Sequence, residues 1–303
     1  MSEISAAATS WRIRGRVLDL NRPIVMGVVN VTPDSFSDGG RFFSVDAAVE
    51  HGRRLCAEGA DMLDIGGEST RPQGAQPVAA AEERRRVVPV VEALVRAVPQ
   101  AALSVDTVKA EVARAALDAG AHIVNDVSGF RLDPRMREIC AETDAGVVLM
   151  HSRGEVADMG TFVFATYGSV VHDVFEELRD LVRAAEAAGV NPACIAVDPG
   201  LGFAKRSEHS LAMLAAVPLL AAWGYPVVVG ASRKRFIGEI TGVKEASERV
   251  HGTVGANVMA FLDGARIFRV HDVAPTRQAL DVAWAVLTNR RSSADLPVAG
   301  EVS

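Results

Sequence analysis

Short runs of β-branched residues recur at fairly even intervals along this 303-residue chain, and this repetition constrains the fold more than any other feature. The runs are expected to be strands and lie at residues 24–29, 62–65, 103–105, 123–124, 147–150, 195–197, 227–229 and 267–270. Segments with helical periodicity lie between them, including residues 45–58, 79–98, 109–119, 170–188 and 247–262. Eight alternating strand and helix pairs predict an α/β fold, a single (β/α)₈ TIM barrel.

A doubly wound open sheet is the main alternative to a barrel. No GxGxxG motif follows the first strand and no change in composition divides the chain, so the barrel is favoured. Aromatic residues make up only 5% of the chain against 49% for all hydrophobic residues, and such aliphatic strands suit a parallel sheet covered by helices. We expect residues 1–22 to form an N-terminal extension with a hairpin that closes the barrel floor, residues 23–290 the catalytic barrel, and residues 291–303 a flexible tail.

Charge and sequence patterns argue against several classes of protein. The net charge of −6 gives no general attraction to nucleic acid or to anionic membranes. The three cysteines lie far apart without a CxxC pair, which argues against a zinc site or a disulfide framework. The N-terminal residues lack the pattern of a secretory signal, so a cytoplasmic enzyme is expected. Residues 211–231 are apolar enough to cross a bilayer, but Pro218, Gly224 and Pro226 predict a helix followed by a strand instead.

Polar residues follow nearly all of the predicted strands. In a (β/α)₈ barrel the carboxyl ends of the strands meet at one mouth, where the chemistry of this fold takes place. Buried polar groups are costly there unless they contact a ligand or one another. The residues at these ends are Asn30, Asp106, Asn125, Asp126, His151, Asp198, Ser232, Lys234, Arg269 and His271, together with the segment GGESTRP at residues 66–72.

Four of these side chains, from four different strand and helix pairs, are expected to form one binding site. They are Asp106, Asn125, Asp198 and Lys234. Together they offer hydrogen-bond acceptors and donors suited to a flat heterocycle with an aminopyrimidinone edge. The alternative is that Asp106 and Asp198 only cap the helices that follow them.

A second group of residues outlines a pocket for a polyphosphate. Arg71, Arg269 and His271 supply positive charge at loop or strand ends, and Asn30 offers an amide oxygen that could join a hydrated Mg²⁺ ion. The loop at residues 66–78 is rich in Gly, Pro and hydroxyl side chains. Its composition predicts either a mobile loop over the site or an ordinary surface loop.

Seven motifs in the chain resemble those of one enzyme family. In chain order they read GVVNVTPDSFSDGG, DIGGESTRP, SVDT, IVNDVSG, DPGLGFAK, GASRKRFIG and FRVHDV, and the similarity extends from about residue 24 to residue 284. In these motifs the chain resembles the dihydropteroate synthase family of the folate pathway. The resemblance implies a transferase barrel, usually a homodimer, that condenses 6-hydroxymethyl-7,8-dihydropterin pyrophosphate with p-aminobenzoate. It further implies release of pyrophosphate, Mg²⁺ as cofactor, and sulfonamides as competitive inhibitors.

The resemblance also assigns roles to residues of this chain. The pterin ring is expected to contact Asp106, Asn125, Val127, Met150, Asp198 and Lys234. The pyrophosphate is expected at Asn30, Arg71, Arg269 and His271, with Asn30 also at the metal, and p-aminobenzoate at Thr70, Arg71, Phe203, Ser232 and Arg233. Catalysis is assigned to Asp106, Lys234, Arg269, His271 and Arg71.

One motif departs from the family pattern. Many members read MHMQG after the fifth strand, whereas this chain reads MHSRG, which keeps Met150 but puts the conformation of the loop at residues 152–168 in doubt. The expected reaction is a dissociative substitution, in which the amine attacks after the bond to pyrophosphate is largely broken and no enzyme nucleophile is needed. The alternatives are a pterin-dependent methyltransferase barrel, which would not need residues 232–234, and a non-catalytic pterin-binding paralogue.

Overall fold

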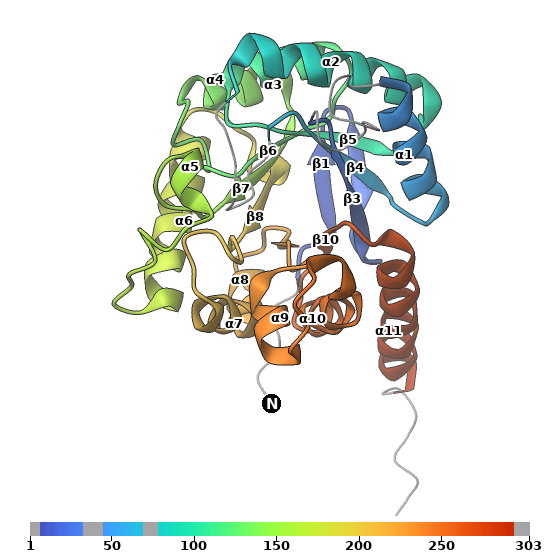
Figure 1. Cartoon of the computed structure of the whole chain (residues 1–303), viewed down its shortest axis with the longest axis vertical. Helices are drawn as coiled ribbons and strands as arrows, with labels where there is room; N and C mark the ends of the chain where they lie inside the picture. The colour runs from blue at the N-terminus through green and yellow to red at the C-terminus, as the bar shows by residue number, and fades with distance from the viewer. Residues whose placement is uncertain (1–6, 33–44, 69–77, 294–303) are drawn as a thin grey trace, which may run out of the picture.

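Most strands of this protein form one parallel sheet that curves into a barrel (Figure 1). The structure is a computed structural model and describes residues 7–32, 45–68 and 78–293. Within these residues the sheet has eight strands in the order β8-β7-β6-β5-β4-β3-β10-β9. They are β3 (Ile24–Asn30), β4 (Met62–Gly66), β5 (Ala102–Asp106), β6 (Ile123–Asp126), β7 (Gly146–Met150), β8 (Ile195–Asp198), β9 (Val228–Val229) and β10 (Ile267–Val270).

The barrel closes through a narrow seam between β8 and β9. A single parallel bridge pairs Val197 with Val227, and the Val197 amide donates to the Pro226 carbonyl at 2.9 Å. The predicted strand at residues 227–229 is therefore shorter than expected, because Val227 contributes only this bridge. The predicted (β/α)₈ barrel is confirmed, and the alternative of a doubly wound open sheet is wrong.

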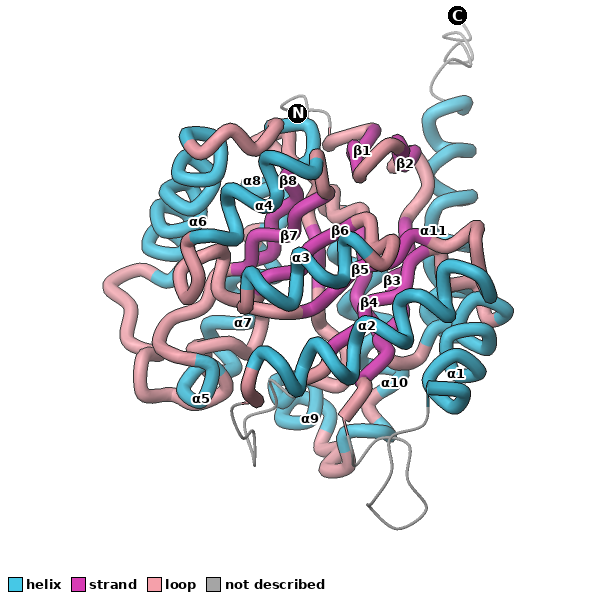
Figure 2. The backbone as a smooth tube through the Cα atoms, turned by 90° about the horizontal axis from the view of Figure 1, so that it is seen from above, coloured by secondary structure: helices cyan, strands magenta, loops and turns pink. Residues whose placement is uncertain are grey.

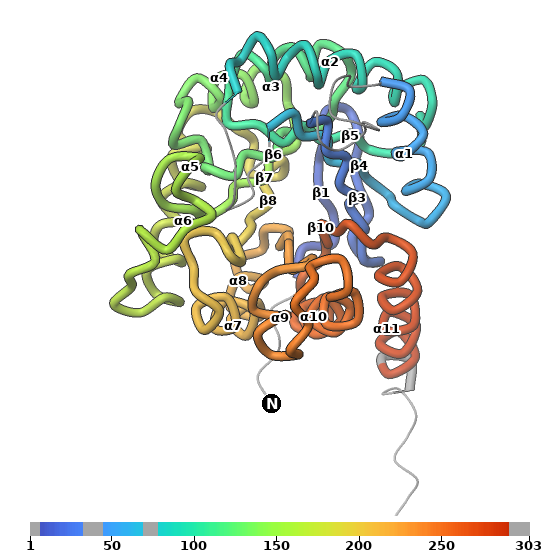
Figure 3. The backbone as a smooth tube through the Cα atoms, in the orientation of Figure 1, coloured from blue at the N-terminus to red at the C-terminus, as the bar shows by residue number. Residues whose placement is uncertain are grey.

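Helices surround the barrel (Figure 3). Their buried apolar side chains pack in one core cluster with those of the strands. In α6 the buried residues Val174, Leu178, Val182 and Ala185 recur every three or four positions, so they form one stripe along the helix. The helices following the strands are α1 (Val45–Ala57), α2 (Ala80–Ala97), α3 (Ala110–Asp118), α4 (Arg135–Thr143), α5 (Val156–Met159), α6 (Val170–Ala187), α7 (Ser207–Ala215), α8 (Val217–Ala221), α9 (Arg235–Thr241), α10 (Val250–Leu262) and α11 (Val273–Ser293). The last of them, α11, packs against the first barrel strand, β3, and completes the ring.

An N-terminal hairpin covers one end of the barrel, opposite α5 and α9 (Figure 2). Its strands are β1 (Ser10–Ile13) and β2 (Arg16–Asp19), and the fully buried Trp11 and Ile13 pack into the apolar layer formed by the starts of the barrel strands. The Trp11 indole donates to the Cys194 carbonyl at 2.8 Å. Ile13 approaches β7 so closely that a Cβ on Gly146 would lie 2.4 Å from its side chain, so glycine is required there. The hairpin thus closes the barrel floor, as predicted.

Some element boundaries differ from the sequence-based expectation. The helix expected at residues 247–262 begins as a 3₁₀ turn, Ala246–Glu248, and continues as α10. The last helix extends to Ser293, past the expected start of the tail at residue 291, and residues 294–303 lie outside the described residues. The apolar segment at residues 211–231 is divided among α7, α8 and β9. Among the described residues, no helix has both the length and the apolar character needed to cross a membrane.

Candidate active site

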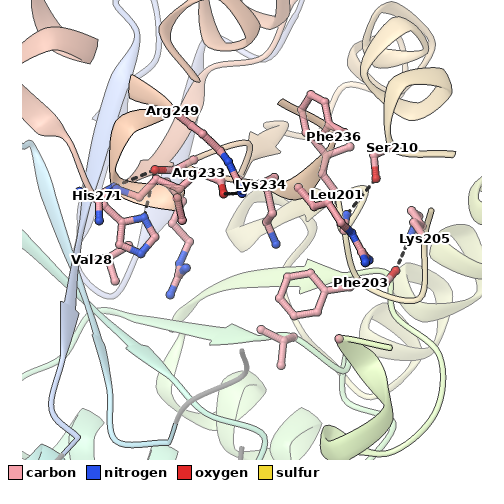
Figure 4. A pocket seen from close by; sticks show the side chains of 18 of the residues that line it. Val28, Leu201, Phe203, Lys205, Ser210, Arg233, Lys234, Phe236, Arg249 and His271 are labelled. Carbon is pink, nitrogen blue, oxygen red and sulfur yellow. Dashed lines mark hydrogen bonds between the residues drawn. The ribbon is translucent and has the colours of Figure 1, made fainter. Parts of the chain in front are cut away.

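The carboxyl ends of the strands surround a cavity of about 910 Å³ (Figure 4). Every predicted site residue that the structure describes lines it: Asn30, Asp106, Asn125, Val127, Met150, Asp198, Phe203, Ser232, Arg233, Lys234, Arg269 and His271. Thr70 and Arg71, the remaining two, lie outside the described residues. The structure therefore brings these side chains together, while their individual roles toward a substrate stay predictions.

The alternation of side chains along the strands builds this cavity. Inward-facing positions at the starts of the strands are apolar, for example Met62 on β4 and Ile123 on β6. Two residues later the same side of each strand carries a polar group, Asp64 on β4 and Asn125 on β6. The parallel register then aligns Asp106 of β5 with Asn125. A dry apolar floor and a polar mouth follow from this pattern.

A network of ionic and polar side chains connects four of the strands. Arg269 on β10 donates from Nε to Asp64 Oδ2 at 2.6 Å and from a terminal nitrogen to Asp106 Oδ2 at 2.7 Å. Asn125 Nδ2 donates to the same Asp64 oxygen at 3.0 Å. The Arg269 side chain is 24% exposed, whereas Asp64 is fully buried, so this guanidinium is held by two carboxylates and still reaches the cavity. The sequence analysis assigned Arg269 to pyrophosphate without foreseeing these partners.

Asp64 is a site residue that the sequence analysis missed. The predicted site residues follow strands, whereas Asp64 lies within β4, two residues before its end. A signal was present, because an aspartate inside the buried sequence MLDIG is costly unless it has partners. Its carboxylate fixes both Asn125 and Arg269, and its second oxygen, Oδ1, has no protein partner.

Burial changes the protonation of the two aspartates that were predicted to contact a pterin. Burial raises the pKa of Asp106 to about 7, although the Arg269 guanidinium opposes the shift. Burial likewise raises the pKa of Asp198 to about 6, against a hydrogen bond from the Gly200 amide to Asp198 Oδ1 at 2.7 Å. The N-cap of α3 is Lys109 and that of α7 is Arg206, so the alternative reading of these aspartates as helix caps is wrong.

Lys234 and Phe203 face one another across the cavity (Figure 4). The Lys234 ammonium lies 4.0 Å from the centre of the Phe203 ring, within the range of a cation–π contact. Burial lowers the pKa of Lys234 to about 8, while the nearby Asp198 carboxylate acts in the opposite direction. The contact joins a residue expected at the pterin to one expected at p-aminobenzoate.

Ser232, Arg233 and His271 form the side of the cavity next to β10. Ser232 Oγ accepts from the His271 amide at 3.1 Å and lies 3.0 Å from His271 Nδ1. Arg233 adopts a left-handed φ of 59° and donates two hydrogen bonds to the Asp272 carboxylate, at 2.9 and 2.6 Å. The positive charge of the Arg233 guanidinium is thus balanced by the Asp272 carboxylate. Arg233 therefore attracts an anion in the cavity less strongly than an unpaired cation would.

The loop that departs from the family motif is fully described and well connected. Ser152 Oγ donates to the Val127 carbonyl at 2.6 Å, and the Arg153 guanidinium donates to the Glu177 carboxylate at 3.1 Å and to the Thr166 carbonyl at 2.7 Å. Arg153 also lies over the Tyr167 ring, 4.1 Å from its centre. The altered residues Ser152 and Arg153 therefore hold the loop in place.

The described residues offer little to bind a metal ion without help from a substrate. No cluster of three or more His, Cys, Asp or Glu side chains suited to a metal is found among them. Asn30 lines the cavity at the end of β3, together with His271 and Arg269. Of these three only Asn30 offers an oxygen ligand, and a single amide oxygen fits Mg²⁺ that is held mainly by waters and by phosphate oxygens, because Mg²⁺ usually keeps several waters and takes only one or two protein ligands.

Comparisons with known proteins agree with the fold and the cavity. The family model described as "Pterin binding enzyme" matches residues 26–271. A dihydropteroate synthase of Mycobacterium leprae is 47% identical over 87% of this chain and 93% of that protein. A mitochondrial folate synthesis bifunctional protein of Arabidopsis thaliana is 42% identical over 90% of this chain, which spans only about half (51%) of that longer protein.

A solved structure is also closely similar. Xanthomonas albilineans dihydropteroate synthase with 4-aminobenzoic acid is 48% identical, with a TM-score of 0.86, over 92% of this chain and 98% of that one. The family match covers most of the chain, and the bacterial relatives are matched over nearly their whole length. The chain therefore belongs to the pterin-binding enzyme family, the family of dihydropteroate synthase.

Proposed function

We propose that this protein is a dihydropteroate synthase, which condenses 6-hydroxymethyl-7,8-dihydropterin pyrophosphate with p-aminobenzoate to give 7,8-dihydropteroate and pyrophosphate. The observation that carries the proposal is the cavity, which combines the polar set Asp106, Asn125, Asp198 and Lys234 with the Phe203 ring and the His271 imidazole. Related enzymes in solved structures hold 4-aminobenzoic acid, 7,8-dihydropteroate and a sulfonamide. These ligands match the chemistry that the cavity offers.

The pterin is held at the inner end of the cavity. Its aminopyrimidinone edge donates to the ionised Asp198 and exchanges hydrogen bonds with Asn125, which Asp64 keeps oriented. Val127 and Met150 belong to an apolar cluster in the cavity wall and pack against the flat ring. Each buried hydrogen bond that one of these polar groups loses costs about 1–3 kcal/mol, so the set discriminates strongly for one ring.

The chemistry proceeds by charge stabilisation around the bond that breaks. As the bond between the methylene carbon and the pyrophosphate oxygen lengthens, positive charge spreads into the pterin ring, and ionised Asp106 stabilises it. Arg269 keeps Asp106 in place, and with His271 and Asn30 faces the leaving pyrophosphate. Mg²⁺ bound to the pyrophosphate would neutralise the charge that develops on that group. The amine of p-aminobenzoate then forms the C–N bond and releases its proton to water.

The p-aminobenzoate lies toward the outer part of the cavity, beside Phe203 and Ser232. A sulfonamide with a para-amino aryl group has the same outline and is expected to compete for this place. The methyltransferase alternative is less favourable, because the segment of Ser232 to Lys234, which that reaction does not need, lines the cavity. The non-catalytic alternative is less favourable as well, because it gives no role to Arg269 and His271 at the position expected for the pyrophosphate.

We also infer that the protein is a cytoplasmic homodimer. Helices α10 and α11 pack against each other and expose large apolar side chains, namely Met259, Leu262, Val282 and Val286. A second copy of the chain would cover such a surface. Sedimentation velocity tests this inference, which predicts a species of twice the 32.1 kDa chain mass.

The activity is tested by supplying dihydropterin pyrophosphate, p-aminobenzoate and Mg²⁺ to the purified protein. We expect 7,8-dihydropteroate and pyrophosphate to form in equal amounts, with no product when either substrate is omitted. Binding of the pterin without turnover would instead support the non-catalytic alternative.

A further inference from the structure

At the outer wall of the cavity lies a group of ionisable side chains, buried at Lys205 and His151, that the proposed mechanism does not use. Its members are Lys205, His151, Glu177 and Arg153, here called the Lys205 cluster. Lys205 is only 1% exposed, and its ammonium lies 2.7 Å from His151 Nδ1. His151 Nε2 in turn lies 2.9 Å from Glu177, which also accepts from Arg153. The cluster joins the end of β7 to the loop between β8 and α7.

The direction of each hydrogen bond in the cluster follows from its chemistry. Partial burial opposes ionisation of Glu177, yet hydrogen bonds from His151 and Arg153 lower its pKa to about 2, so it is an acceptor only. His151 Nε2 must therefore carry the proton, which leaves Nδ1 as an acceptor for the Lys205 ammonium. Burial lowers the pKa of His151 to about 4, in agreement with a neutral imidazole. One ammonium is thus held by a fixed chain of partners.

Lys205 also contacts the backbone of the loop that carries Phe203. Its ammonium donates to the Phe203 carbonyl at 3.2 Å, as Figure 4 shows. This loop turns sharply, with left-handed φ angles at Gly200, Gly202 and Ala204. A Cβ on Gly200 would lie 1.9 Å from the His151 carbonyl oxygen, so the loop is pressed against the end of β7. Ala204 is unfavourable in this conformation, and the bonds around it must keep it there.

The position of the Phe203 ring therefore depends on the Lys205 cluster. The ring packs beside Val127, Met150 and Met159 and faces the Lys234 ammonium at 4.0 Å. Lys205 itself lines the cavity, and burial lowers its pKa to about 7, which shows how unfavourable this place is for a cation. If this residue only filled space, a buried apolar side chain would stabilise the fold better than a lysine. We therefore attribute the presence of Lys205 to the hydrogen bonds that it makes.

We propose that Lys205 is a positioning residue for the p-aminobenzoate subsite, which holds the Phe203 carbonyl against His151 and so fixes the aromatic wall beside Lys234. The inference rests on the proposed function. It predicts a larger effect on p-aminobenzoate than on the pterin. Asp106 is held by Arg269 and Asn125 by Asp64, and Asp198 interacts with Lys205 through its charge only, whereas the Phe203 backbone is bound by Lys205 directly. A residue needed merely for folding would affect both substrates alike.

The test compares the wild type with Lys205→Met, which has a similar length but no charge, and with Lys205→Arg. We expect Lys205→Met to raise KM for p-aminobenzoate by about tenfold or more, while Kd for a pterin without pyrophosphate changes by less than about threefold. Lys205→Arg should recover part of the loss because it can still donate. Arg183→Met, at an exposed residue of α6 that pairs with Asp180 and does not line the cavity, is the matched control and should leave both constants unchanged.

A second pair of variants keeps the proposal testable should Lys205→Met fail to fold. Glu177→Gln weakens the acceptor of His151, whereas Glu176→Gln alters the neighbouring surface residue, which pairs with Arg179. Only Glu177→Gln should raise KM for p-aminobenzoate. An unchanged KM in the folded Lys205→Met or Glu177→Gln protein, or equal losses in pterin binding and p-aminobenzoate use, overturns the proposal. A wild type that forms no dihydropteroate would instead refute the proposed function.

Discussion

Replacement of Asp64 tests whether this buried carboxylate organises the pterin pocket. Its Oδ2 atom accepts from Arg269 at 2.6 Å and from Asn125 at 3.0 Å. In Asp64→Ala both donors lose their acceptor in a buried place. Breaking a buried ion pair in this way costs about 3–5 kcal/mol, and because Arg269 keeps its bond to Asp106 we expect a loss of unfolding free energy near the lower end, about 3 kcal/mol.

Asp64→Asn separates the charge from the hydrogen bonds. The amide oxygen can replace Oδ2 as an acceptor, and the amide nitrogen would take the place of Oδ1, which has no protein partner. Only the charge is then lost, so we expect a smaller destabilisation, about 1–2 kcal/mol, the difference between charge-assisted and neutral hydrogen bonds. The Asp64 carboxylate raises the pKa of Asp106, so this variant should also lower that pKa below its value of about 7.

Urea unfolding measures the stability, and calorimetry of pterin binding measures the effect on Asn125. The loss of Asn125 orientation in Asp64→Ala should weaken pterin binding by about tenfold, or about 1.4 kcal/mol. Asp180→Asn, at an exposed residue that pairs with Arg183 on α6, is the matched control and should change the stability by less than about 1 kcal/mol. Equal stability of Asp64→Ala and Asp180→Asn, or full pterin affinity in Asp64→Ala, would refute this reasoning.

Three further predictions concern other parts of the molecule. Pterin binding needs ionised Asp198, whose folded pKa is raised to about 6, so calorimetry should show affinity that falls by up to about tenfold per unit below pH 6; a flat profile between pH 6 and pH 5 would contradict this. Trp11→Ala removes a fully buried side chain from the barrel floor, so urea unfolding should show a loss of about 3–5 kcal/mol in stability. The kcat of the folded variant should stay near the wild-type value, and a large fall in that kcat would argue against a purely structural hairpin. Sulfonamide inhibition should be relieved as p-aminobenzoate is added, and inhibition that does not depend on its concentration would place the drug elsewhere.

The sequence predicted which side chains gather at the mouth of the barrel where those residues lie at the ends of strands. Asp106, Asn125 and Asp198 follow apolar runs directly, and the two-residue period of a strand fixes which side they face. Asp64 was missed because it lies inside a strand. Its neighbours in the sheet register are Val28 and Ser104, which also lie inside strands and not in loops. Its role became visible only once the barrel brought β10 and β6 beside it.

The residues that were hardest to predict depend on contacts between distant segments. Lys205 follows a turn, and its partners His151 and Glu177 lie 54 and 28 positions earlier in the chain, so no local pattern marks it. The pairing of Val197 with Val227 likewise depends on closure of the whole sheet. The strand propensity of residues 227–229 alone does not predict it. Local patterns thus predicted the elements, and the barrel geometry decided their partners.

The central claim is that polar side chains from separate strand ends form one pterin site in a stably folded barrel. Calorimetric titration of a pterin without pyrophosphate into the wild type, Asn125→Ala and Asp198→Ala tests it most directly, with thermal unfolding of each protein as the check on folding. We predict one site per chain in the wild type, and in both variants a loss of at least about tenfold in affinity, with cooperative unfolding retained. Unchanged pterin affinity in either folded variant would contradict the claim.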